Sequence, residues 1–170
     1  MVTLLGRAKR PPICFSHVND SEPSPEKISH SELSAFTQRA RRAVGLRGEL
    51  SVRITSAREL QELSRRFLHK NRPTDVLSFP ALGVEGGDIA IAREIAAKNA
   101  RNLGHPLNTE LKILILHGLL HLAGFDHESD NGEMTARESQ LRKELGLPSG
   151  LIERTEGDNS TKAKRGGRRA

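Results

Sequence analysis

The segment 109–123 restricts the possible folds more than any other part of the chain. It reads Thr-Glu-Leu-Lys-Ile-Leu-Ile-Leu-His-Gly-Leu-Leu-His-Leu-Ala, so a helix drawn through it is apolar on nearly every side. A helix that is apolar all round is buried in the middle of a protein. We therefore expect a central helix here, with the rest of the chain packed around it.

Three other segments carry the signals of short strands. Apolar and polar residues alternate across 50–54, which indicates a half-buried strand. Residues 75–79 and 88–92 predict two more strands, joined as a hairpin by the glycine-rich segment between them. Pro73 and Pro80 flank the strand at 75–79. Because proline cannot donate a hydrogen bond to a ladder, we place this strand at an edge of the sheet.

Helix signals fill most of the remaining chain. A serine followed three residues later by glutamate forms a capping box, which occurs at Ser29 and Glu32 and again at Ser56 and Glu59. The expected helices cover about 29–44, 56–67, 93–103 and 130–145, and a further short strand is expected around 13–16. Their inward-facing residues include Leu33, Phe36 and Ala40 in the first, Leu60, Leu63 and Phe67 in the second, and Met134, Leu141 and Leu145 in the last. These elements predict an α+β fold with a small mixed β-sheet of about four strands.

Length and charge predict one domain followed by a tail. A chain of 170 residues is long enough for one core and short for two. The formal charge is +6, of which residues 161–170 contribute +5, because they hold five Lys or Arg and no acid. We expect a single domain over 1–150 and a disordered basic tail over 151–170, which either aids solubility or contacts RNA.

Composition also indicates the cellular compartment of the protein and the kinds of partner it can bind. Cys14 is the single cysteine, which excludes an internal disulfide and fits a reducing compartment. No apolar run reaches the roughly 18 residues needed to cross a bilayer. We expect a cytoplasmic protein that does not contact a membrane. The chain has five Phe and no Trp or Tyr, so we expect the core to need these rings and to leave none for stacking on bases.

Three of the seven histidines stand in one pattern, His117-Gly-Leu-Leu-His121-Leu-Ala-Gly124-Phe-Asp-His127. Side chains four apart on a helix project from the same face, so His117 and His121 can aim at one point. Gly124 can take the left-handed conformation that ends a helix, which lets His127 reach the same point from the following loop. Three imidazole ligands with an open fourth position are typical of catalytic zinc. The alternative is two core histidines satisfied by hydrogen bonds, which three histidines at this spacing disfavour.

The residue after the first histidine indicates which class of zinc hydrolase this chain can be. Zinc peptidases of the H-E-x-x-H class carry a glutamate there as general base, whereas this chain has Gly118. A standard peptidase mechanism is therefore disfavoured. Zinc lowers the pKa of a bound water to about 7 and polarises a phosphoryl or carbonyl oxygen, so hydrolysis remains the predicted chemistry.

In these residues the sequence resembles the YbeY family of bacterial metal-dependent endoribonucleases. The resemblance rests on Pro73-Thr-Asp-Val-Leu-Ser-Phe-Pro80 followed by Gly87-Asp-Ile, and on the histidine motif with its Gly-Phe-Asp-His ending. It implies a zincin-like α+β fold and one Zn²⁺ ion held by His117, His121 and His127. It also implies cleavage of single-stranded RNA, maturation of the 3′ end of 16S ribosomal RNA and a part in ribosome quality control at the small subunit. No DNA substrate is expected.

This chain departs from the family pattern beside the proposed groove. Family members usually carry an arginine directly after the aromatic residue, where this chain has Leu68, and an acidic residue three positions later, where it has Asn71. Arg66 is the candidate replacement in the reaction, and no other catalytic residue is assigned beyond the zinc-bound water. The substrate groove is predicted to include Arg65, Arg66, Lys70, Asp75 and Ser78.

Two other functions stay open from the sequence. One is a zinc peptidase or amidase, whose substrate strand would add to the edge of the sheet. The other is a ribosome-associated RNA-binding assembly factor with weak or no cleavage, which the leucine at position 68 favours.

Overall fold

The computed structural model describes residues 28–68, 73–81, 86–127 and 129–148, in which the chain alternates between helices and short strands. The elements, in chain order, are α1 (His30–Val44), β1 (Leu50–Thr55), α2 (Ala57–Leu63), a π-helical turn η1 (Ser64–Leu68), β2 (Val76–Pro80), β3 (Gly87–Ala92), α3 (Arg93–Leu103), α4 (Leu107–Leu122) and α5 (Glu133–Leu145). This confirms the predicted α+β class.

The sheet of the described region has three strands in the order β1-β3-β2. β1 runs parallel to the central strand β3, with Leu50 opposite Gly87. β2 runs antiparallel to β3, with Val76 opposite Ile91, so the predicted hairpin, the edge position of β2 and the mixed sheet are all confirmed. The expected strand at 13–16 lies outside the described residues, so the prediction of about four strands is not tested.

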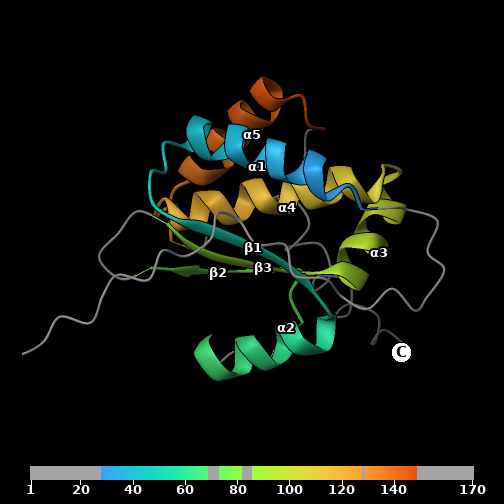
Figure 1. The fold of residues 1–170 in the computed structure, drawn as a ribbon. Helices are drawn as coiled ribbons and strands as arrows, with labels where there is room; N and C mark the ends of the chain where they lie inside the picture. The colour runs from blue at the N-terminus through green and yellow to red at the C-terminus, as the bar shows by residue number, and fades with distance from the viewer. Residues whose placement is uncertain (1–27, 69–72, 82–85, 128, 149–170) are drawn as a thin grey trace, which may run out of the picture.

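The helices form layers on both faces of this sheet (Figure 1). α4 packs against β2 and β3, and α1 and α5 contact the side of α4 that faces away from the sheet. α2 contacts β3 on the opposite face. Twelve of the sixteen residues of α4 are buried, which confirms the prediction of a central helix. In the described ranges, no helix is both long and apolar enough to cross a membrane.

The first helix follows its sequence signals closely. The Ser29 hydroxyl accepts a hydrogen bond from the backbone N–H of Glu32, and Gly45 ends the helix in the left-handed conformation with φ +94°. Leu33, Phe36 and Ala40 are at most 1% exposed. Removing a large apolar side chain from water stabilises the fold by about 1.5–3 kcal/mol, so this stripe holds α1 against α4.

The second helix differs from the prediction at its C-terminal end. α2 ends at Leu63, and a π turn over Ser64–Leu68 follows it. A π turn bonds residue i to i+5 and so holds more residues per turn than the 3.6 of an α-helix, which shifts the phase of the buried stripe. Leu60 is fully buried, whereas Phe67 is 56% exposed. The expectations that Phe67 faces inward and that the core uses every Phe are therefore wrong.

Candidate metal centre

The three histidines of the motif converge at the C-terminal end of α4. His117 and His121 lie one turn apart on this helix, and their Nε2 atoms are 3.1 Å apart. The His127 ring centroid lies 5.5 Å from that of His117 and 5.3 Å from that of His121. One ring nitrogen from each residue lies within 4.8 Å of the other two. The predicted ligands are thus brought together at one point.

Gly124 allows the chain to turn back between the second and third histidines. Its φ of +91° is in the left-handed region that residues with a Cβ atom rarely adopt. The backbone N–H of Phe125 bonds to the carbonyl of Leu120 at 3.1 Å, which closes the helix end. His127 follows this turn directly, as the sequence predicts.

The spacing of the ring nitrogens of His117 and His121 fits a tetrahedral metal ion. Two nitrogens bound tetrahedrally at 2.0–2.1 Å lie about 3.3 Å apart, close to the 3.1 Å between the Nε2 atoms of His117 and His121. His127 Nδ1 is buried and has no hydrogen-bond partner in the described part of the chain. A bound cation would satisfy these nitrogens. The site can therefore hold one metal ion through His117, His121 and His127.

The protonation state of His121 also suits a ligand. Burial lowers its pKa, and the neighbouring His117 and His127 lower it further, to about 4. Because metals bind the neutral imidazole, His121 is ready to coordinate at neutral pH without first losing a proton.

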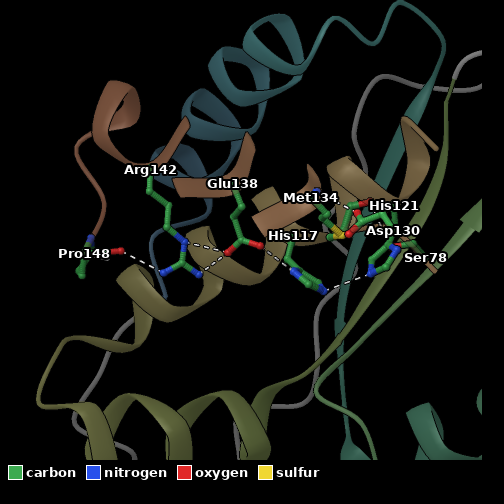
Figure 2. A network of polar contacts seen from close by, with 9 residues as sticks. Ser78, His117, His121, Asp130, Met134, Glu138, Arg142 and Pro148 are labelled. Carbon is green, nitrogen blue, oxygen red and sulfur yellow. Dashed lines mark hydrogen bonds and ion pairs between the residues drawn. The ribbon is translucent and has the colours of Figure 1, made fainter. Parts of the chain in front are cut away.

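A buried carboxylate orients the first histidine (Figure 2). Glu138 Oε2 of α5 lies 2.9 Å from His117 Nδ1. The neutral ring donates its Nδ1–H to this carboxylate, which leaves the lone pair of Nε2 facing the site. Arg142 donates to the other oxygen of Glu138, from Nε at 2.8 Å and from Nη2, and its Nη1 bonds to the carbonyl of Pro148 at 3.0 Å. Glu138 and Arg142 are only 1% and 2% exposed.

Glu138 stays ionised in this buried position. Burial alone would raise its pKa, but the hydrogen bond from His117 and the charge and hydrogen bonds of Arg142 lower it below the usual range. The carboxylate can therefore accept from both neighbours at neutral pH. Its role was not predicted from the sequence. The available signal was its position, because Glu138 falls between Met134 and Leu141 on the buried stripe of α5.

Comparison with known proteins shows to which family this chain belongs. The model of the endoribonuclease YbeY family matches residues 17–146, which is most of the chain. This chain belongs to the YbeY family. The expectation raised by the motifs is thereby confirmed, and family membership places the chain among metal-dependent endoribonucleases.

Individual YbeY relatives agree with this membership. The endoribonuclease YbeY of Koribacter versatilis is 57% identical over 139 residues, which cover 81% of this chain and 91% of the relative. That of Solibacter usitatus is 42% identical over 133 residues, covering 78% and 90%. The solution structure of TM1509 from Thermotoga maritima is similar with a TM-score of 0.50 and 30% identity, covering 71% of this chain and 85% of that one.

In this YbeY chain, residues of the sheet pack closely against Gly118, the position that carries the glutamate in zinc peptidases. A Cβ atom added at Gly118 would lie 3.0 Å from Ile89 Cδ1, Ile89 Cγ2 and Ser78 Oγ. Ile89 is 1% exposed and belongs to the central strand. A glutamate at this position would crowd Ile89 and Ser78, so packing as well as sequence disfavours the peptidase alternative.

The residues predicted for the groove lie in three different settings. Arg65 and Arg66 are exposed on η1. Asp75 precedes β2 and accepts a hydrogen bond from Asn99 at 3.2 Å. Ser78 on β2 donates to the carbonyl of Gly118 at 3.2 Å, between the two histidines of α4. Lys70 lies outside the described residues, and Leu68, at the place of the usual arginine, ends η1.

A cavity of about 460 Å³ opens on the loop between α4 and α5. It is lined by Ala123, Gly124, Phe125, Asp126, Ser129, Asp130, Asn131 and Glu133. Three of these are acidic and none is basic, so the cavity repels a phosphate backbone.

Proposed function

We propose that this chain is a zinc-dependent endoribonuclease that hydrolyses phosphodiesters of single-stranded RNA at His117, His121 and His127. The observation that carries the proposal is the arrangement of these three residues. Three neutral nitrogen donors with a fourth position left to solvent or substrate are typical of catalytic zinc, whereas structural sites are closed by a fourth residue. When bound there, zinc supplies an activated water and offsets charge on the phosphoryl oxygen.

The protein's own residues orient and bind around that centre. Glu138 and Arg142 fix the ring of His117, and exposed Arg65 and Arg66 offer positive charge to the RNA backbone. Arg66 is the candidate for the role that arginine holds at the next position in other family members. Zinc is favoured over nickel or copper by its preference for tetrahedral nitrogen ligands and by its availability.

Several finer predictions belong to the same proposal. The substrate is the 3′ region of 16S ribosomal RNA, met on the small ribosomal subunit in the cytoplasm, with a role in ribosome quality control. The family resemblance supports this, as do the basic residues on η1. The zincin-like class, a fourth strand, the domain boundary at residue 150 and the disordered basic tail over 151–170 stay predictions.

A binding-only assembly factor is the competing function, because leucine occupies position 68. It would hold ribosomal RNA without cutting it. Such a protein would show salt-sensitive RNA binding, because contacts to phosphates release counterions. This binding would survive the loss of one metal ligand.

Cleavage of a single-stranded RNA that contains the 3′ region of 16S ribosomal RNA tests the proposal. Zinc-loaded protein, chelated protein and the His121→Ala variant are compared, with His30→Ala, at an exposed histidine of α1, as the control. We expect cleavage by the zinc-loaded protein and by His30→Ala only. Equal cleavage by His121→Ala would remove the metal centre from the reaction, and binding without cleavage in every sample would favour the assembly factor.

A further inference from the structure

An aromatic side chain lies uncovered on η1, on the face of the sheet opposite the metal centre. Phe67 is 56% exposed, and in the described ranges only Leu103 is another exposed large hydrophobic residue. The Phe67 ring meets the edge of Phe79 with 5.7 Å between centroids and an interplanar angle of 71°. The Arg66 guanidinium lies 5.6 Å from the centre of the Phe67 ring. Phe67 is thus held by a second ring and accompanied by a cation while part of its surface faces solvent.

The strand β2 connects this pair to the histidines. Phe79 follows Ser78 directly on β2, and the Ser78 hydroxyl bonds to the carbonyl of Gly118 beside His117. Successive side chains of a strand point to opposite faces, so Phe79 and the histidines lie on the two faces of one edge strand. Figure 1 shows that α2, which leads into η1, and the C-terminal half of α4 extend toward the same end of the sheet. A strand of RNA laid across this edge would contact both the Phe67–Phe79 pair and the histidines.

The exposed ring of Phe67 is suited to bind an unpaired base rather than a duplex. Every base has a π-face that stacks on an aromatic ring whatever the sequence, but this face is covered in a duplex. The Arg66 guanidinium adds a cation–π contact to the ring and a positive charge for the adjoining phosphate. The acidic lining of the cavity between α4 and α5 directs the backbone away from the other side.

We propose that Phe67, supported by Phe79, is a stacking platform that binds an unpaired base of an RNA strand laid across the edge strand β2, on the face opposite the metal centre. This rests on the proposed function and adds a physical basis for its preference for single strands. It also reverses the expectation from composition that no phenylalanine is free to stack.

The absence of tryptophan from the chain allows a direct test. Phe67→Trp introduces a single indole, and fluorescence is followed while chelated full-length protein is titrated with a single-stranded RNA of the 16S 3′ region. The matched control is Leu103→Trp, at the other exposed large hydrophobic residue of the described ranges. We expect saturable quenching in Phe67→Trp by the single strand, little by a duplex of the same sequence, and none in Leu103→Trp. Equal quenching by strand and duplex, or in both variants, would overturn the platform.

Affinities measured by fluorescence anisotropy of labelled RNA separate stacking from simple apolar contact. Phe67→Ala and Phe67→Leu should both weaken binding by about 5- to 150-fold, the range for loss of one stacked base, while Phe67→Tyr and Leu103→Ala keep it. The salt dependence should be unchanged, because no charge is lost. Wild-type affinity in Phe67→Leu would reject an aromatic role.

Failure of the platform is distinguishable from failure of the nuclease. If Phe67→Ala binds like the wild type while chelation still stops cleavage, the platform is wrong and the proposed function stands. If the wild type binds single-stranded RNA no better than the duplex, the platform is wrong whatever cleavage shows. If the wild type binds in the expected pattern without cutting, the platform stands and the nuclease function fails.

Discussion

Glu138 is a buried charged residue in the apolar stripe of α5, and it supports the metal centre. Met134 and Leu141 of α5 face the core as the sequence predicts, and Glu138 lies between them with 1% exposure. Burying a carboxylate is costly unless it is paired and hydrogen-bonded. His117 on one side and Arg142 on the other provide these partners. The cost of burial is thus offset by contacts that orient a ligand.

Glu138→Gln should weaken zinc binding by about 10- to 100-fold, the usual effect of losing an outer partner of a ligand. The amide keeps the shape but turns one donor group toward His117 or Arg142, so one buried donor loses its acceptor. Competition with a chromogenic chelator measures the affinity. Glu144→Gln, at an exposed position of the same helix, is the matched control. Equal affinity in both variants, with native circular dichroism, would show that Glu138 does not support the centre.

The pKa of His121 makes the stability of the metal-free protein depend on pH. This pKa is about 4 in the folded chain, against 6.5 for an unperturbed histidine, so between these values the unfolded state binds more protons. Stability therefore falls as pH falls through this window. Urea unfolding of chelated protein should show a lower free energy of unfolding at pH 5 than at pH 7, and a smaller difference in His121→Asn. An equal difference in both proteins would contradict the assignment.

Among the elements, α1 and α4 follow most directly from sequence, and η1 follows least. The capping box and buried stripe of α1, and the all-round apolar surface of α4, are local patterns that tertiary packing reinforces. The π turn over Ser64–Leu68 interrupts the helical period after α2, and no periodicity in the sequence signals it. Periodicity therefore places Phe67 in the core, although it is exposed in the structure.

The contact between α4 and the sheet depends on a glycine in the helix. Overpacking by the new methyl of Gly118→Ala should cost about 1–3 kcal/mol, and alanine is favoured over glycine in a helix by roughly 1 kcal/mol. Gly118→Ala should therefore lower the free energy of unfolding by about 0–2 kcal/mol. The new methyl would crowd Ile89 and Ser78 at 3.0 Å. Urea unfolding of wild-type and variant protein measures the difference.

A double-mutant cycle tests whether the cost of Gly118→Ala comes from crowding Ile89. Ile89→Val removes the Cδ1 atom that the new methyl would meet. Contacting residues do not add independently, so Gly118→Ala should cost less in the Ile89→Val background than in the wild type. The same cost in both backgrounds would mean that the methyl is accommodated without crowding the Cδ1 atom of Ile89.

At the scale of the whole molecule, the metal centre joins two parts of the chain that are distant in sequence. His117 belongs to α4, and the carboxylate that orients it belongs to α5, 21 residues later. The ligands were predictable because their spacing is local to one helix and its turn. Glu138 and the stacked pair of Phe67 and Phe79 were not, because these contacts exist only once α5, η1 and β2 are packed.

The measurement that tests the metal centre most directly is a titration of chelated protein with zinc, in which RNA cleavage and bound zinc are measured together. Cleavage should rise linearly and reach its plateau at one zinc ion per chain, and His121→Ala should neither bind the ion tightly nor cut. Full cleavage before zinc is added, or a plateau unaffected by the loss of His121, would contradict a hydrolase centred on these three histidines.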